Sequence, residues 1–175
     1  MQAWGKGCIL PKRDFASAFR HIPISPDDSP LLGFQWPNRY YSERFLPFGL
    51  RTAPYLFNLF AELFHWILDS ELQRQKLATC TIHYLDDFLM VLPPHANPTE
   101  YTAIFSHLCS EVGVTIKTSK KEERNVVSFA SIEFDTKDML IRLPTKKLLK
   151  AWALVNDARK QKSPPFAKSR RLQDT

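Results

Sequence analysis

Residues 81–92, Thr-Ile-His-Tyr-Leu-Asp-Asp-Phe-Leu-Met-Val-Leu, contain two short apolar runs that decide how the chain folds. The runs 81–85 and 88–92 have the length and composition of β-strands, and the two residues between them predict a tight hairpin. Two-residue turns favour Asn-Gly or Asp-Gly, whereas this tip carries Asp86 and Asp87 without a glycine. Adjacent carboxylates repel each other unless a cation neutralises them. The tip therefore predicts a divalent metal site, although Asp is also a common turn residue and the pair alone fits a structural turn.

The hairpin is the last of three segments that follow one another in a characteristic order. Residues 12–24 (KRDFASAFRHIPI) come first, residues 46–58 (LPFGLRTAPYLFN) second, and residues 84–87 (YLDD) third. Together they resemble motifs A, B and C of the reverse transcriptases, while residues 113–121 are similar to motif D and residues 127–135 to motif E. The resemblance covers residues 9–143. Within the family, residues 32–36, 135–136 and 141–144 most resemble retrotransposons of the tyrosine-recombinase (DIRS-like) group.

The composition is that of a folded intracellular domain. A chain of 175 residues with 44% hydrophobic and 13% aromatic side chains is long and apolar enough to bury a core. Its cysteines, Cys8, Cys80 and Cys109, are odd in number and widely spaced, which favours neither a disulfide framework nor a zinc site. The N-terminus lacks an apolar signal core, and the longest apolar stretch, residues 55–68, is too short to span a bilayer. We expect a protein of the cytoplasm or nucleus that is not secreted and has no membrane partner.

The net charge of +6 is concentrated in the last third of the chain. Residues 1–110 contain 9 Lys and Arg against 10 Asp and Glu, whereas residues 111–175 contain 15 against 8. Such an excess suits a polyanion such as nucleic acid, although lysines on a solvated helix face would give the same count. The resemblance to a polymerase favours the nucleic-acid interpretation.

Capping and turn residues predict the element order. A strand should end near Asp14, and residues 31–36 and 39–45 should form a hairpin. Thr52 is expected to cap a helix of about 20 residues whose apolar stripe faces the core, and Asn97 caps a second helix that ends at Gly113. Strands are expected at residues 114–116, 126–134 and 139–143, and a basic helix at residues 145–162. The predicted core stripe comprises Leu56, Phe57, Phe60, Leu63, Phe64 and Ile67.

This order of elements predicts an α+β fold of the ferredoxin-like polymerase palm type, in which helices pack on one face of an antiparallel sheet. We expect residues 1–145 to form a partial reverse-transcriptase palm with motifs A to E. Residues 146–175 would form a basic helix and tail that stops before a thumb. Only 13 residues precede Asp14, so most of the fingers region is expected to be missing.

The resemblance implies two-metal nucleotidyl transfer with Mg²⁺ or Mn²⁺ as the cofactor. By motif position, Asp14 and Asp86 would be ligands of both ions, and Asp87 an outer or occasional ligand. Lys120, seven residues after Gly113, stands where the family places a lysine that assists departing pyrophosphate. Lys117 and Lys121 are close enough in sequence to leave this register open.

The resemblance also implies a set of residues that contact the incoming nucleotide. Phe19, five residues after Asp14, would abut the sugar and exclude a 2′-hydroxyl, which favours deoxynucleotides. Gly49 would let the backbone approach the nucleotide, and Phe48 stands where retroviral enzymes carry Gln. The remaining expected substrate contacts are Phe15, Tyr84 and Leu85. In motif E, residues 129–131 read Phe-Ala-Ser where the family usually shows Phe-Leu-Gly, a change expected to disturb a tight turn.

The function expected from these features is that of an RNA-directed DNA polymerase domain of a retrotransposon. Its partners would be a primed RNA or DNA template and deoxynucleoside triphosphates, and the oligomeric state stays open. One alternative is a catalytically silent mobile-element remnant that at most binds nucleic acid through its basic last third. A second is some other two-metal phosphotransferase.

Overall fold

A four-stranded antiparallel sheet in the order β4-β5-β1-β6 forms the centre of the protein. The computed structural model describes residues 4–117 and 122–160. The strands are β4 (Cys80–Tyr84), β5 (Asp87–Val91), β1 (Leu10–Asp14) and β6 (Glu122–Arg124). Strand β5 pairs with both β4 and β1, and Asp87 lies opposite Tyr84 on one side and opposite Asp14 on the other. The predicted aspartate hairpin is therefore the middle of the sheet.

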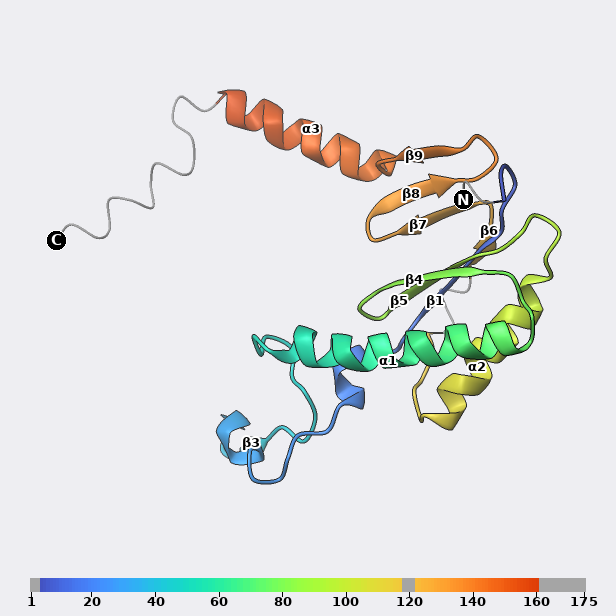
Figure 1. Ribbon diagram of the computed structural model, residues 1–175. Coiled ribbons are helices and arrows are strands. Elements are labelled where there is room, and N and C mark those ends of the chain that lie inside the picture. Colours follow the sequence, from blue (N-terminus) through green and yellow to red (C-terminus); the bar gives the residue numbers. More distant parts are fainter. Residues whose placement is uncertain (1–3, 118–121, 161–175) are drawn as a thin grey trace.

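Two helices cover one face of this sheet, as Figure 1 shows. They are α1 (Ala53–Arg74) and α2 (Pro98–Glu111). Helix α2 begins as expected, because the Asn97 side chain accepts a hydrogen bond from the Thr99 N–H. Gly113, which follows the end of the helix, has a left-handed φ of 72°. Helix α1 also starts after the expected residue, but the Thr52 side chain makes no capping hydrogen bond. The α+β palm architecture predicted from the sequence is confirmed.

Five phenylalanine rings fill the space between the sheet and the helices. Phe15 and Phe88 come from the sheet, Phe57 and Phe64 from α1, and Phe105 from α2. The Phe15 ring centroid lies 5.0 Å from that of Phe88 and 5.1 Å from that of Phe64. Because side chains alternate across a strand, Leu10, Leu89 and Val91 point to the opposite face, where they pack with Val127. The two faces of the sheet thus belong to two separate apolar clusters.

The buried stripe of α1 differs from the one predicted. Its buried residues are Ala53, Phe57, Ala61, Phe64, Leu68 and Leu72. Leu56 and Leu63, which we expected in the core, are exposed by 39% and 55%. The helix has apolar side chains on more than one face, and the face with the alanines, which permit close approach to the sheet, is the buried one. The predicted stripe was correct for Phe57 and Phe64 and wrong for the two leucines.

A second, three-stranded sheet packs against the helix-free face near β1. It contains β7 (Val126–Phe129), β8 (Ile132–Asp135) and β9 (Leu140–Arg142) in sequential order. The single strand predicted over residues 126–134 is wrong, because the chain reverses at Ala130 and Ser131. Residues 114–116 form no strand and contribute only an isolated bridge between Ile116 and Phe15.

The turn between β7 and β8 keeps its shape without a glycine. Ala130 and Ser131 have φ angles of 46° and 75°, in the left-handed region that two-residue hairpin turns require. A non-glycine residue is strained there by about 1 kcal/mol. The tight turn that we expected to be disturbed by the loss of glycine is present, at a cost in backbone strain.

Replacing Ser131 by Gly should raise the free energy of unfolding by about 0.5–1 kcal/mol, because glycine relieves this strain. Urea denaturation of the wild type and the variant measures the difference. Ser128→Gly is a matched control, since Ser128 lies in the extended strand β7, where glycine should lower stability. A destabilised Ser131→Gly variant would contradict the backbone geometry of this turn.

The remaining elements lie at the periphery. A hairpin of β2 (Gly33–Gln35) and β3 (Tyr40–Ser42) forms where it was expected, and 3₁₀ helices cover Ala18–His21 and Ser29–Leu32. Helix α3 (Thr145–Lys160) follows β9 and projects away from both sheets (Figure 1). Within the described part of the chain, no helix combines the length and apolar character needed to cross a membrane.

Candidate active site

The β4–β5 hairpin places Asp86 and Asp87 differently from the sequence prediction. Because Tyr84 pairs with Asp87, the two turn residues are Leu85 and Asp86. The predicted tip, Asp86 and Asp87, is therefore wrong by one position. Leu85 takes the positive φ of 52° that the turn demands, an unfavourable conformation for a branched side chain. Such strain is frequent at functional sites.

Asp14 ends β1 directly opposite Asp87. Residues opposite each other in an antiparallel pair present their side chains on the same face of the sheet. This is the face away from α1 and α2, since the adjacent residues Phe15 and Phe88 face the helices. The turn is attached to the end of β1 by the Phe15 N–H, which donates a hydrogen bond of 3.0 Å to the Asp86 carbonyl. The register of the hairpin and its hydrogen bond to the end of β1 together bring three carboxylates to one edge of the sheet.

Lys117 lies between two of these carboxylates. Its Nζ is 2.7 Å from Asp14 Oδ1 and 3.5 Å from Asp86 Oδ2. Because both oxygens contact one nitrogen atom, the Asp14 and Asp86 side chains converge on a single small volume. Asp87 has a separate partner, since its Oδ1 lies 3.3 Å from the Nζ of Lys12. Asp87 thus has a different lysine partner from the other two, and its predicted role as an outer ligand stays a prediction.

Burial and the neighbouring Asp14 carboxyl raise the pKa of Asp86 above its ordinary value, and the Lys117 cation opposes this effect. Asp14 is 1% exposed, so its charge is strongly dependent on a cation beside it. These oxygens are the hard donors that Mg²⁺ and Mn²⁺ prefer. Within residues 4–117 and 122–160, no three His, Cys, Asp or Glu side chains form a group that could hold a metal by themselves. Two carboxylates fit an ion whose remaining ligands are water and substrate phosphates.

The predicted sugar gate, Phe19, lies in the 3₁₀ helix Ala18–His21 that follows β1. Its ring centroid is 5.1 Å from that of Phe48 and 5.7 Å from that of Phe57. Phe48 is 69% exposed, so this pair forms a partly open aromatic wall. Beside it, Gly49 has a φ of 94°, and a side chain added there would meet no atom within 4 Å. The glycine therefore provides both a left-handed backbone and free space.

The other predicted substrate residues divide into exposed and buried ones. The Tyr84 side chain is 61% exposed at the end of β4, and Leu85 is half-buried in the turn. Phe15 is completely buried in the aromatic core, and its backbone N–H is already bonded to Asp86. Neither its ring nor its N–H is open to solvent, and its predicted contact with substrate stays a prediction. Lys120 lies outside the described residues.

A histidine pair behind the sheet was not expected from the sequence. His65 of α1 and His83 of β4 approach with their Nδ1 atoms 2.8 Å apart, and His65 Nε2 lies 3.4 Å from Asp69. The His83 ring also stacks on Phe88. Burial lowers the pKa of His83, as does the neighbouring His65, while Glu62 acts in the opposite direction. The lowered pKa favours the neutral imidazole of His83, whose Nδ1 shares a hydrogen bond with Nδ1 of His65.

This pair makes the stability of the fold dependent on pH. His83 in the unfolded chain has a pKa of about 6.5, and in the folded chain its pKa is lower. The unfolded state therefore binds more protons, and the free energy of unfolding should fall as the pH decreases below about 6.5. Urea denaturation between pH 5 and pH 8 should show a smaller decrease for His83→Gln, whereas the exposed His95→Gln should behave as the wild type. Equal decreases in all three proteins would refute the assignment.

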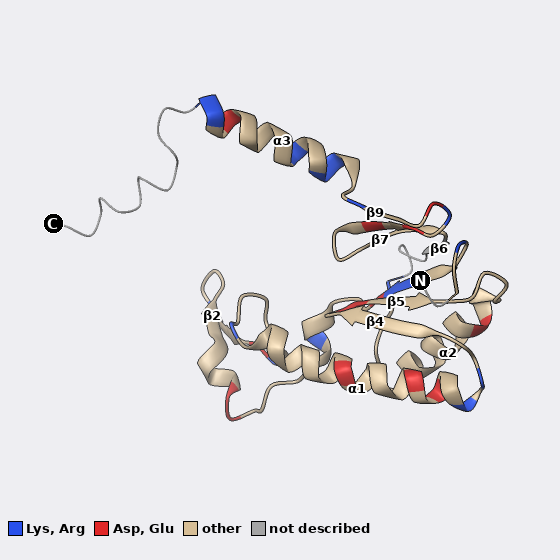
Figure 2. Cartoon of the chain, turned by 45° about the horizontal axis from the view of Figure 1, so that its top comes forward, with Lys and Arg blue, Asp and Glu red and all other residues tan. Residues whose placement is uncertain are grey.

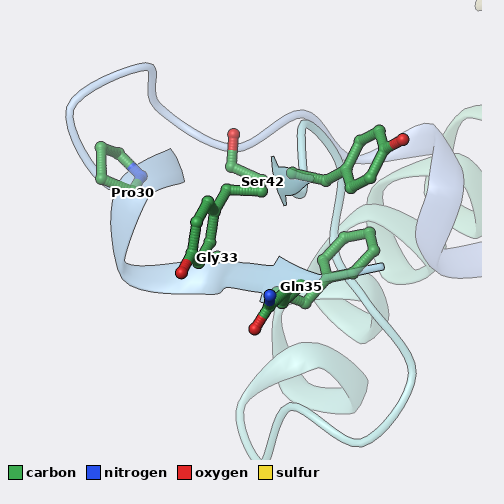
Figure 3. Close-up of a pocket in the computed structure, with 7 residues that line it drawn as sticks. Pro30, Gly33, Gln35 and Ser42 are labelled. Atoms are coloured by element: carbon green, nitrogen blue, oxygen red, sulfur yellow. The ribbon is translucent and has the colours of Figure 1, made fainter. Parts of the chain in front are cut away.

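A hollow in the surface lies away from these residues. It has a volume of about 590 Å³ and is formed by the β2–β3 hairpin and Pro30, as Figure 3 shows. Its lining residues are Pro30, Gly33, Phe34, Gln35, Tyr40, Tyr41 and Ser42. It contains no carboxylate and none of the predicted site residues. The carboxylate pair, rather than this hollow, is the better candidate for a catalytic centre.

Solved structures of a viral reverse transcriptase share this fold. The foamy viral protease-reverse transcriptase in complex with double-stranded DNA superposes with a TM-score of 0.67 at 16% identity, over 91% of this chain and 25% of that chain. The same viral enzyme in complex with an RNA/DNA hybrid gives a TM-score of 0.63 at 19% identity, over 87% of this chain and 21% of that chain. At this level of identity the likeness defines the fold, which is that of a polymerase palm.

Sequence comparison then defines the family. The family model for "Reverse transcriptase (RNA-dependent DNA polymerase)" matches residues 1–154. Protein P of duck hepatitis B virus is 32% identical over 133 residues, which cover 73% of this chain and 15% of the viral protein. The genome polyprotein of Petunia vein clearing virus is 29% identical over 131 residues, 74% of this chain and 6% of the polyprotein. This chain belongs to the reverse transcriptase family and spans only a small part of the length of these relatives.

Proposed function

We propose that this chain is the palm of an RNA-directed DNA polymerase that joins deoxynucleoside triphosphates to a primer 3′-hydroxyl on an RNA or DNA template. The observation that carries the proposal is the convergence of Asp14 and Asp86, from motifs A and C, on one cation. Membership of the family supports the same reaction.

In this proposal each residue of the site has a defined task. Asp14 and Asp86 hold Mg²⁺ or Mn²⁺. Asp87, which is paired with Lys12, acts as an outer ligand that adds negative charge near the ion. When bound, such ions lower the pKa of the attacking hydroxyl and neutralise charge on the phosphates. Phe19 and Phe48 form a wall beside the sugar, while Gly49 leaves room for the nucleotide. Tyr84 and Leu85 support the primer end, and Lys120 is proposed to assist the departing pyrophosphate.

The basic end of the chain is proposed to bind the nucleic-acid backbone. In Figure 2 the ribbon of α3 is blue at several Lys and Arg positions, whereas the ribbon of α1 is red at several Asp and Glu positions. Those of α3 are Lys146, Lys147, Lys150, Arg159 and Lys160, and all of them are exposed. Contacts of this kind attract phosphates without reading sequence, and their strength falls steeply with salt. We propose residues 1–145 as the partial palm and residues 146–175 as this basic extension.

The origin of the chain is a finer proposal. Residues 32–36, 135–136 and 141–144 resemble DIRS-like retrotransposons, and on these segments we propose that the chain comes from a mobile element. The relatives described above are viral proteins, so the proposal rests on these segments alone. Phylogenetic placement of the flanking genomic sequence would test it. A neighbouring tyrosine-recombinase gene supports the proposal, and a viral capsid gene in its place contradicts it.

The proposed activity is tested by primer extension with a hybrid enzyme. Phosphoryl transfer depends mainly on positioning, so the chain is joined to the fingers and thumb of a related viral polymerase. On a primed RNA template with Mg²⁺ or Mn²⁺, the hybrid should add deoxynucleotides, and EDTA should stop the addition. A hybrid that folds and binds the primed template but adds no nucleotide with either ion would favour the silent-remnant alternative.

A further inference from the structure

Lys117 lies in the position that a metal ion would take between Asp14 and Asp86. Its Nζ contacts both carboxylates, and the 2.7 Å contact to Asp14 is the shorter. The lysine side chain is 34% exposed, whereas that of Asp14 is 1% exposed. A deeply buried carboxylate thus has its charge balanced by a cation that can leave towards solvent.

The backbone fixes Lys117 at this position. The Lys117 N–H donates a hydrogen bond of 2.8 Å to the Asp14 carbonyl, and the Ala16 N–H donates one of 2.8 Å to the Thr115 carbonyl. These bonds hold the segment that precedes residue 118 alongside the end of β1. The lysine is therefore attached beside the carboxylates by main-chain bonds that do not depend on its side chain.

One lysine carries half the charge of a divalent ion and cannot coordinate an oxygen as a metal does. We propose that Lys117 is an internal competitor for the metal, which neutralises Asp14 and Asp86 in the empty palm and swings out when a divalent ion binds. The proposal rests on the function proposed above. It implies that the lysine weakens metal binding before a nucleotide arrives and keeps the buried Asp14 carboxylate, beside the partly exposed Asp86, compatible with a folded sheet.

The wild-type chain allows a direct test by amine labelling. Each lysine is labelled with an acetylating reagent, and the extent of labelling is measured by peptide mass spectrometry, with and without Mg²⁺ at constant ionic strength. Lys117 should be labelled about threefold or more faster with Mg²⁺, because the ion releases it from its ion pairs. Lys150, which is exposed on α3, should be unaffected. Equal labelling of Lys117 in both conditions, at Mg²⁺ concentrations that saturate the site, would overturn the proposal.

Variants provide a second test through Mn²⁺ binding, which is followed by electron paramagnetic resonance. Lys117→Met should bind Mn²⁺ about tenfold more tightly than the wild type, and Lys150→Met, which removes the same charge from α3, should bind as the wild type does. Lys117→Arg keeps the positive charge, so its Mn²⁺ affinity should remain close to that of the wild type. This variant shows whether Lys117→Met acts through the loss of charge.

Asp86→Asn separates failure of this inference from failure of the metal site itself. If Asp86→Asn loses Mn²⁺ binding while Lys117→Met binds Mn²⁺ no more tightly than the wild type, the proposed metal site is supported. The proposal that Lys117 competes with the metal is then wrong. If Asp86→Asn binds Mn²⁺ as the wild type does, the ion binds elsewhere and both proposals fail.

Discussion

Asp86→Asn should reduce primer extension by the hybrid enzyme on the order of a thousandfold, which corresponds to about 4 kcal/mol of transition-state stabilisation. Asparagine keeps the size of the side chain and removes the charge that would hold the ion. Asp14→Asn should have an effect of the same order, because the two carboxylates converge on one cation position. Initial rates at saturating template measure the loss.

Asp87→Asn is the matched control for this pair. Asp87 forms its ion pair with Lys12 rather than with Lys117, so we expect a loss of about tenfold or less. Thermal unfolding of all three variants separates lost chemistry from lost folding. An Asp86→Asn enzyme that retains more than about a tenth of the wild-type rate would exclude Asp86 as a direct metal ligand.

Phe19→Ala should change the choice of sugar more than the rate with deoxynucleotides. The ring stands beside the exposed Phe48, where its removal would open space for a 2′-hydroxyl. We expect the ratio of kcat/KM for ribonucleotides to that for deoxynucleotides to rise by about 10–100-fold, as in other steric discriminations. Single-nucleotide incorporation with matched ribonucleotide and deoxynucleotide substrates measures this ratio.

Phe57→Ala distinguishes a gate from a core residue. Phe57 contacts Phe19 from the buried side and is fully buried, so its loss should lower stability by about 3–5 kcal/mol and leave sugar selectivity unchanged. If Phe19→Ala reduces the use of both sugars equally and lowers the melting temperature as Phe57→Ala does, Phe19 is only a core residue.

The parts of the fold that were predicted correctly have local signals. Asn97 and Gly113 mark the two ends of α2, and the apolar runs around Asp86 mark β4 and β5. The register of the hairpin cannot be predicted from its own residues, because the position of Asp87 is fixed by pairing with Asp14 on strand β1. With that pairing, Leu85 lies in the turn, although leucine is not among the residues that turns favour.

Side-chain placement in the site depended on contacts that the sequence does not reveal. Lys117 and Asp14 are separated by 103 positions, and only the folded segment beside β1 brings them together. Its position in the sequence makes Lys117 a candidate for the motif D lysine beside Lys120, but nothing in that spacing predicts an ion pair with two aspartates. The burial of Phe15 could likewise not be predicted from the sequence. Its position in the motif indicates that the residue is near the site, but it does not indicate which face of the sheet its side chain points to.

The sequence of α1 does not show which face of the helix is buried, and the reason is physical. Apolar side chains such as Leu63 and Trp66 lie on its exposed side, so helical periodicity alone cannot decide which stripe meets the sheet. Small residues decide it in the structure, because Ala53 and Ala61 allow the helix to approach the aromatic cluster closely.

The central claim, that Asp14 and Asp86 hold the catalytic metal, is tested most directly by locating Mn²⁺. Crystals of the hybrid enzyme with primed template, a non-hydrolysable deoxynucleoside triphosphate and Mn²⁺ would show the ion by its anomalous scattering. We predict an anomalous peak within about 2.5 Å of oxygen atoms of both Asp14 and Asp86. Anomalous peaks confined to the triphosphate or to other side chains, with both aspartates free of metal in the ternary complex, would contradict it.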